Sequence, residues 1–217
     1  MPLKLQALHK VDELTPEARA TGCVNTTFFC SSATSSSTLR HVGTNTDAAA
    51  VSNVLLSAFL AFPTPPPISA PKQFAPGRAA AFVVGGGGAT RAAIYALSRL
   101  NLSPIFIVNR KPVETEAVVD SFPAVDLRPL PTVEQARQEM EDLRKRGLRL
   151  VCGVGAIPYM VYKPRMTTLR ALGEERGWTS VCGTEVVLGN CFEQFKLWTG
   201  RDVPVDVRSS ARALLAA

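Results

Sequence analysis

Two short runs of consecutive apolar residues, Ala79–Val84 and Ile105–Val108, are the strongest hydrophobic pattern in the chain. Uninterrupted runs of this length are typical of strands that are buried on both faces of a parallel sheet. Between them, a block of four glycines is followed by Ile94, Leu97 and Leu100 at helical spacing. The segment therefore predicts a strand, a glycine turn, a helix and a second parallel strand.

The same alternation continues further along the chain. Thr132 and Gln135 form a capping-box pattern for a charged helix that ends near Gly147, and residues 148–154 predict a third parallel strand. Strands that alternate with helices in this way are typical of the α/β class. We therefore expect a Rossmann-type, doubly wound parallel sheet in this part of the chain.

The residues before this unit show a different pattern. Residues 25–29 and 38–43 predict two strands, and the polar run 30–37 between them is too poor in apolar side chains to pack. We therefore expect a hairpin with a loop at its tip. Apolar residues at helical spacing over 48–62 predict a helix, with Asp47 in position to cap its N-terminus.

A proline-rich connector separates the two patterns. Residues 64–78 contain five prolines, which are unfavourable in helix interiors and in central strands. Near the end of the chain, residues 184–198 carry an apolar stripe that stops at Gly200, which predicts an amphipathic helix packed against another part of the protein. The chain thus divides into a segment before the connector, an α/β domain after it, and a C-terminal helix.

Composition excludes several classes of function. No apolar stretch approaches the roughly 20 residues of a membrane span, and the N-terminus lacks a secretory signal, so we expect no membrane association and a cytoplasmic location. The five cysteines contain no Cys-x-x-Cys pair and the two histidines stand apart, which indicates neither a disulfide framework nor a metal site. The net charge of +6 is dispersed and accompanies no nucleic-acid-binding motif, so it fits a basic surface or an anionic small-molecule ligand.

The glycine block is the first candidate binding site. Gly85, Gly87 and Gly88 lie where a strand turns into a helix, and a pyrophosphate can approach the backbone there only where no Cβ intervenes. The helix, with Ala89 and Thr90 in its first turn, presents free N–H groups and the positive end of its dipole to the phosphates. A tight turn is the alternative, but the flanking strand and helix patterns favour a dinucleotide site.

The end of the second strand indicates which dinucleotide binds. Sites for NAD usually place Asp or Glu there, on the ribose 2′-hydroxyl, whereas this sequence has Asn109, Arg110 and Lys111. An Arg fork can pair with a 2′-phosphate that a carboxylate would repel. We therefore expect NADP(H) as the cofactor, with NAD(H) as the alternative. If no ligand binds here, Arg110 and Lys111 are simply residues at the solvated end of the strand.

Several segments form an ordered set along the chain: MPLK at 1–4, GCVNT at 22–26, TNTD at 44–47, VVGGGGATRAAIYALSRLNLSPIFIVNR at 83–110 and GTEVVLGNCFEQFKLWTG at 183–200. This set resembles the motifs of the shikimate dehydrogenase family, and its residues are most similar to those of fungal quinate/shikimate dehydrogenases. The resemblance covers most of the chain, from Met1 to about Gly200.

The resemblance implies oxidation of a ring hydroxyl of shikimate or quinate by hydride transfer to NADP. It matches Lys4 to the family's catalytic lysine and Asp47 to its partner, and it assigns substrate contacts to Asn25, Thr26 and Asn190. Ile157 would lie on the nicotinamide side of the cofactor. The implied domains are a partial α/β substrate-binding domain at 1–63, the connector at 64–78, an NADP-binding domain at 79–183, and a helix with a tail at 184–217 that returns to the substrate domain.

Departures from the family leave other functions open. The chain begins inside the lysine motif, so we expect an N-terminal truncation that removes a strand and a serine pair. Asn190 replaces a glutamine, Cys191 replaces a glycine, and a strand and a helix of the relatives have no counterpart between Ile157 and Tyr162. A non-catalytic sensor resembling the dehydrogenase-like part of fungal quinate repressors is the alternative to the enzyme, and an incomplete product without a stable fold is a third. No pattern indicates an oligomeric state.

Overall fold

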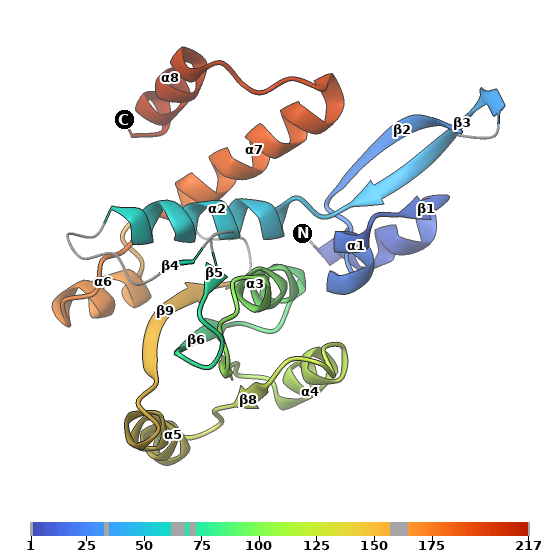
Figure 1. The fold of residues 1–217 in the computed structure, drawn as a ribbon. Coiled ribbons are helices and arrows are strands. Elements are labelled where there is room, and N and C mark those ends of the chain that lie inside the picture. The colour runs from blue at the N-terminus through green and yellow to red at the C-terminus, as the bar shows by residue number, and fades with distance from the viewer. Residues whose placement is uncertain (1, 33–34, 62–67, 70–72, 157–164, 217) are drawn as a thin grey trace. The chain divides into compact units, whose positions relative to one another are not determined.

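The computed structural model describes residues 2–32, 35–61, 68–69, 73–156 and 165–216 (Figure 1). The chain divides into two compact units, a first unit of Met1–Leu55 with Val161–Ala217 and a second unit of Leu56–Met160. Each unit has a sheet of its own. The domain boundaries that the resemblance implies stay predictions.

The second unit contains the parallel sheet that the apolar runs predict. Strands β6 (Ala79–Val84) and β7 (Ile105–Val108) pair in parallel, and β9 (Arg149–Gly155) lies parallel to β6 on its other edge. A short strand, β8 (Leu127–Pro129), pairs with β7, so the order over the described residues is β8-β7-β6-β9. The α/β fold class and the three expected strands are confirmed. Strand β8 was not expected, because its three residues carry no apolar run.

Three helices of the second unit connect these strands: α3 (Gly88–Arg99), α4 (Pro112–Asp120) and α5 (Val133–Lys145). Strands β6, β7 and β8 follow one another across the sheet, and the chain then returns to place β9 on the other side of β6. Because crossovers are right-handed, this return places α5 on the opposite face from α3 and α4. On the face that α5 covers, Leu143 packs with the buried Ala80 and Phe106. Both faces of the sheet are covered, as in a doubly wound fold.

The end of the connector packs on the second unit. Strands β4 (Ile68–Ser69) and β5 (Gln73–Phe74) pair antiparallel. The N–H of Phe74 donates to the carbonyl of Leu100 at 2.9 Å, and the Phe74 ring lies edge-on to Phe59 with centroids 5.0 Å apart. The prolines at 65–67 and 71 lie outside the described residues.

The first unit contains a hairpin with a short parallel strand beside it. Strands β2 (Thr26–Ser32) and β3 (Ser35–Thr44) pair antiparallel, and β1 (Glu13–Leu14) pairs in parallel with β3. The hairpin is confirmed, but a loop over the whole of 30–37 is wrong, because both strands continue into this polar run. A ladder of backbone hydrogen bonds does not require apolar side chains, so polar composition was a poor guide to where the strands end.

The expected helices at 48–62 and 184–198 are confirmed. The longer of the two ends at Gly200, whose φ of 69° is the left-handed conformation that glycine adopts readily. The other begins at Asp47, so a capping role for the Asp47 side chain is wrong. The helices and 3-10 turns outside the second unit's sheet are η1 (Pro2–Lys4), η2 (Gln6–Lys10), α1 (Pro16–Thr21), α2 (Asp47–Leu60), α6 (Thr168–Glu175), α7 (Gly183–Thr199) and α8 (Val205–Ala216).

We predict that Phe106→Ala lowers the free energy of unfolding by about 3–5 kcal/mol, because the fully buried ring leaves a cavity in the core. Urea unfolding followed by circular dichroism measures the loss. Val113→Ala on α4 is the control, since its side chain is 77% exposed and its removal should cost less than about 0.5 kcal/mol. Equal losses for the two variants would contradict the burial of Phe106.

Candidate functional site

In the first unit, Lys4 and Asp47 form an ion pair between the Lys4 ammonium and Oδ2 of Asp47. Lys4 ends the 3-10 turn η1, and its carbonyl accepts a hydrogen bond of 2.9 Å from the N–H of Val24, which fixes the turn against the chain leading into β2. The Asp47 side chain is 2% exposed and that of Lys4 is 15% exposed. The structure therefore brings the two predicted catalytic residues together in a largely buried setting.

The backbone that carries Asp47 is held by Asn45. Oδ1 of Asn45 accepts from the N–H of Asp47 at 3.0 Å, and Nδ2 of Asn45 donates to the carbonyl of Cys23 at 3.2 Å. The same Nδ2 lies 2.9 Å from Sγ of Cys23. Burial raises the pKa of the Cys23 thiol, so the thiol stays neutral beside the ion pair. Asn45 thus satisfies the first N–H of α2, and the Asp47 carboxylate is left for Lys4.

Asn190 contributes a second contact to Asp47 from helix α7. Its Nδ2 donates to Oδ1 of Asp47 at 2.8 Å, and its Oδ1 accepts a hydrogen bond from the Thr46 hydroxyl. Helix α7 approaches α2 closely at Gly189, where an added Cβ would lie only 3.3 Å from Cβ of Ala50. A small residue on each helix therefore allows the short Asn190 side chain to reach Asp47.

Asn25 and Thr26 lie next to this contact. Oδ1 of Asn25 accepts from the N–H of Thr46 at 3.0 Å and from the Thr26 hydroxyl at 2.9 Å. Nδ2 of Asn25 is buried and has no hydrogen-bond partner among the described residues. A buried amide without an acceptor is costly, so this donor is available to an oxygen of a bound molecule.

Two further residues of this cluster were missed by sequence reasoning. Gln194 donates from Nε2 to the Thr26 hydroxyl at 2.9 Å, and Thr46 links Asn25 to Asn190. Gln194 follows Asn190 by one helical turn on α7, so helical spacing could have placed both on one face. Thr46 lies inside the motif TNTD at 44–47, where no sequence signal distinguishes it from Thr44 as a site residue.

In the second unit, the glycine block forms the turn from β6 into α3. Gly85 has a φ of 134°, and a Cβ there would lie 2.5 Å from the carbonyl oxygen of Ala156, while a Cβ on Gly86 would lie 2.2 Å from Nδ2 of Asn109. A Cβ on Gly87 would meet nothing within 4 Å. Gly85 is thus required by the protein's own backbone, a side chain at Gly86 would displace the Asn109 and Glu114 side chains, and Gly87 faces open space.

The turn lies where the strand order reverses, at the carboxyl ends of β6 and β9, which is the place where α/β sheets bind ligands. Gly87 is the N-cap of α3, and Gly88, Ala89 and Thr90 form its first turn. The Thr90 hydroxyl is fully buried and has no hydrogen-bond partner within the described part of the chain. The N–H groups at a helix start suit an anion.

A cluster of charged and polar side chains borders the glycine turn at the end of β7. Nδ2 of Asn109 donates to the carbonyl of Lys111 at 3.1 Å, and Lys111 forms an ion pair of 2.7 Å with Glu114. The hydrogen bond from Lys111, helped by one from Asn109, lowers the pKa of the Glu114 carboxyl. Arg110 is exposed and has no ion-pair partner among the residues that the structure describes. Glu114 was missed because it follows the strand by several residues, inside α4.

The remaining predicted position, Ile157, lies outside the described residues. Among the residues that are described, no group of three His, Cys, Asp or Glu side chains could hold a metal ion, and no helix is long and apolar enough to cross a membrane.

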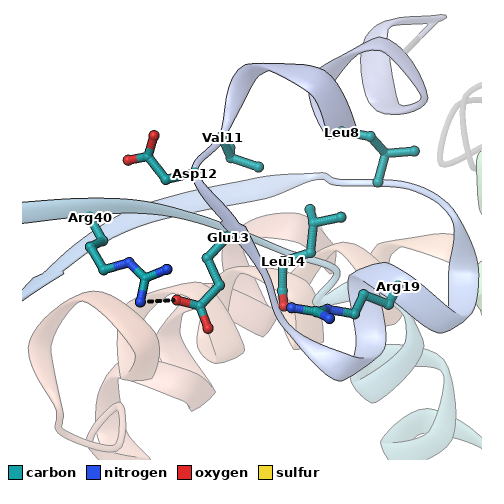
Figure 2. Close-up of a pocket in the computed structure, with 7 residues that line it drawn as sticks. All are labelled: Leu8, Val11, Asp12, Glu13, Leu14, Arg19 and Arg40. Atoms are coloured by element: carbon teal, nitrogen blue, oxygen red, sulfur yellow. Dashed lines mark hydrogen bonds and ion pairs between the residues drawn. The ribbon is translucent and has the colours of Figure 1, made fainter. Parts of the chain in front are cut away.

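A separate hollow of about 410 Å³ lies beside β1 and β3 in the first unit, and none of the predicted residues lines it. Figure 2 shows its charged lining, in which Arg40 pairs with Glu13 at 3.1 Å. Nε of Arg19 donates to the carbonyl of Leu14 at 3.0 Å. Most of these charged side chains already pair or hydrogen-bond with other groups of the protein, so the hollow does not indicate a ligand.

No protein-family model matches the sequence. The chain is 30% identical to the pentafunctional AROM polypeptide of Komagataella phaffii over 92% of its own length, and it spans 13% of that polypeptide.

Solved structures match almost the whole chain. The dehydroquinate dehydratase and shikimate dehydrogenase of AroM from S. pombe has a TM-score of 0.71 and 25% identity, over 97% of this chain and 41% of that one. Shikimate 5-dehydrogenase from Thermus thermophilus in complex with shikimate has a TM-score of 0.68 and 26% identity, over 100% of this chain and 77% of that one. The same enzyme in complex with NADP(H) and shikimate gives the same TM-score of 0.68. These matches confirm the resemblance to shikimate dehydrogenases in sequence and fold.

We predict that Lys4→Met lowers the free energy of unfolding by about 3 kcal/mol, because it leaves the 2%-exposed Asp47 carboxylate without its counter-ion. The double variant Lys4→Met with Asp47→Asn should recover most of that loss, since no buried charge remains. Urea unfolding of the single and double variants tests the coupling, with the exposed Lys10→Met as control. Equal stability of the Lys4 and Lys10 variants would contradict a buried ion pair.

Proposed function

We propose that this chain, which resembles shikimate dehydrogenases in sequence and fold, is a shikimate dehydrogenase-type oxidoreductase. It would move a hydride reversibly between NADP(H) and a ring hydroxyl of shikimate or quinate, with 3-dehydroshikimate or 3-dehydroquinate as the oxidised form. The observation that carries the proposal is the buried pair of Lys4 and Asp47, beside an Asn25 amide that has a free donor.

The pair suits proton transfer at a ring hydroxyl. A hydride leaves a carbinol carbon only as the hydroxyl proton is taken by a positioned base. The neutral amine of Lys4 can take that proton, and the Asp47 carboxylate then stabilises the ammonium that forms.

The neighbouring amides suit recognition of a polyhydroxylated ring. Nδ2 of Asn25 is a donor without a partner among the described residues, and a substrate hydroxyl oxygen would accept from it. Thr26 is already bonded to Asn25 and Gln194, so its contribution is to hold the Asn25 amide in place. Asn190 retains one N–H and one lone pair beyond its bonds to Asp47 and Thr46.

The second unit supplies the residues for the cofactor. When bound, the nicotinamide ring supplies the hydride acceptor. The open side of Gly87 and the N–H groups of Gly88, Ala89 and Thr90 would hold the pyrophosphate, and the Arg110 guanidinium would pair with a 2′-phosphate. The buried Thr90 hydroxyl without a partner fits a site whose polar groups are completed by a ligand. Residues 79–183 would then be the cofactor domain, and 1–63 with 184–217 the substrate domain.

A second candidate function is a sensor that binds the same ligands without turnover. Asn190 favours it, because the short amide is engaged with Asp47 and Thr46 inside the protein. A longer glutamine at this position would reach further toward a ligand. Thermal stabilisation by NADP and shikimate without NADPH formation would support the sensor over the enzyme.

We predict that Lys4→Arg lowers kcat for NADPH formation by about 10²- to 10⁴-fold, because an arginine keeps the ion pair with Asp47 but cannot act as a base. Steady-state assays with shikimate and with quinate measure the effect, and Lys10→Arg on the exposed side of η2 is the matched control. Equal rates for the two variants would refute Lys4 as the base.

We predict that Gly87→Ala leaves thermal stability unchanged but weakens NADP binding by about ten- to a hundredfold, because the new Cβ fills the space that a pyrophosphate needs at the helix start. Isothermal titration calorimetry with NADP measures the affinity. Gly173→Ala in α6 is the control, since its Cβ would come no closer than 3.7 Å to Cβ of Trp178 and lies outside the glycine turn. Unchanged affinity in Gly87→Ala would exclude the glycine turn as the phosphate site.

A further inference from the structure

A carboxylate lies at the corner of the glycine turn, where the sequence pattern indicated only basic residues. An added Cβ on Gly86 would lie 2.9 Å from Oε2 of Glu114 and 2.2 Å from Nδ2 of Asn109. Glu114 therefore stands directly against the backbone of the turn, although it belongs to the first turn of α4. The position of α4 is fixed in part by Arg91 of α3, which donates to the carbonyl of Ala117 at 3.1 Å.

The orientation of Glu114 toward the turn is maintained by two donors. Oε1 pairs with Lys111 at 2.7 Å, and Oε2 lies 3.5 Å from Nδ2 of Asn109. The lowered pKa of Glu114 keeps the carboxyl ionised at neutral pH. Of the two cations that follow Asn109, one is therefore bound to a carboxylate, and Arg110 is the cation that remains for an external phosphate.

This corner of a dinucleotide site determines which adenosine ribose is accepted. A carboxylate there accepts hydrogen bonds from the ribose hydroxyls of NAD, and it repels the 2′-phosphate of NADP. Arginine has the opposite preference, because its guanidinium pairs with the phosphate. The structure places the Glu114 carboxylate against the turn and beside Asn109, the residue that Arg110 follows, whereas the sequence alone showed only the cations.

We propose that Glu114 is a specificity-determining residue, whose carboxylate accepts a hydrogen bond from the ribose 2′-hydroxyl and opposes the 2′-phosphate, so that the site binds NAD(H) with an affinity close to that for NADP(H). This inference rests on the proposed function, because it concerns the same dinucleotide site. It differs from the expectation drawn from Arg110 and Lys111, which favours NADP(H) alone.

A purely structural role for Glu114 makes a different prediction. An acidic residue in the first turn of a helix interacts favourably with the helix dipole, and an exposed ion pair with Lys111 adds little to stability. In that case, neutralising Glu114 would change stability slightly and would change the affinities for the two nucleotides by the same factor.

Binding of NADH and NADPH to the purified full chain, followed by nucleotide fluorescence, tests the proposal without an activity readout. The variants are Glu114→Gln, which keeps the shape and removes the charge, and Glu116→Gln, an exposed residue of the same helix as matched control. We expect dissociation constants for the two nucleotides within about tenfold of each other in the unaltered protein, since a charge interaction exposed to water changes an affinity by less than about tenfold. Glu114→Gln should shift the ratio toward NADPH by about tenfold, and Glu116→Gln should leave it unchanged.

The outcomes separate this inference from the proposed function. An identical ratio in Glu114→Gln and Glu116→Gln overturns the role of Glu114, while saturable NADPH binding that Arg110→Ala weakens leaves the dinucleotide site standing. A preference for NADPH above a hundredfold in the unaltered protein also overturns the inference. Absence of saturable binding of either nucleotide overturns the proposed function itself, and the role of Glu114 with it.

Discussion

The Asp47 carboxylate is almost fully removed from water, and a buried negative charge requires both a counter-ion and hydrogen-bond donors. Lys4 supplies the charge, and Asn190 supplies a donor from a helix that stands far away in sequence. Asn45 occupies the first N–H of α2, which leaves the carboxylate for these partners. The start of the chain, the hairpin end, α2 and α7 are thus arranged around one charge in the first unit.

In the second unit, close contacts likewise surround the glycine turn. The backbone of Ala156, the residue after β9, lies so close to Gly85 that no side chain fits there, and the Asn109 amide stands against Gly86. The turn is therefore closely packed at Gly85, whereas a Cβ on Gly87 would meet nothing within 4 Å. A preformed concave backbone of this kind binds an anion without first paying to order itself.

The sequence predicted best what local patterns encode. Strands β6 and β7 have the predicted bounds because short uninterrupted apolar runs are typical of strands buried on both faces. Helix α7 stops where Gly200 adopts a left-handed backbone. Pairing of Lys4 with Asp47 is a long-range contact, which no local spacing reveals, and only the resemblance suggested it. The position of Glu114 could not be predicted for the same reason, since its place beside Gly86 depends on how α4 packs. The polar strands at the hairpin tip were missed because backbone pairing leaves no apolar signature.

The order of the strands also has a consequence for how the protein folds as it is made. Strand β9 completes the sheet beside β6, so Ala79 pairs with Arg149, far away along the chain. A ribosome must therefore release β7, α4, β8 and α5 before β6 gains its second neighbour, and one edge of a strongly apolar strand stays uncovered until then. Such non-local pairing slows folding and leaves an unpaired, aggregation-prone strand edge exposed during synthesis. The sheet of the second unit can therefore be completed only after residues 149–155 have left the ribosome.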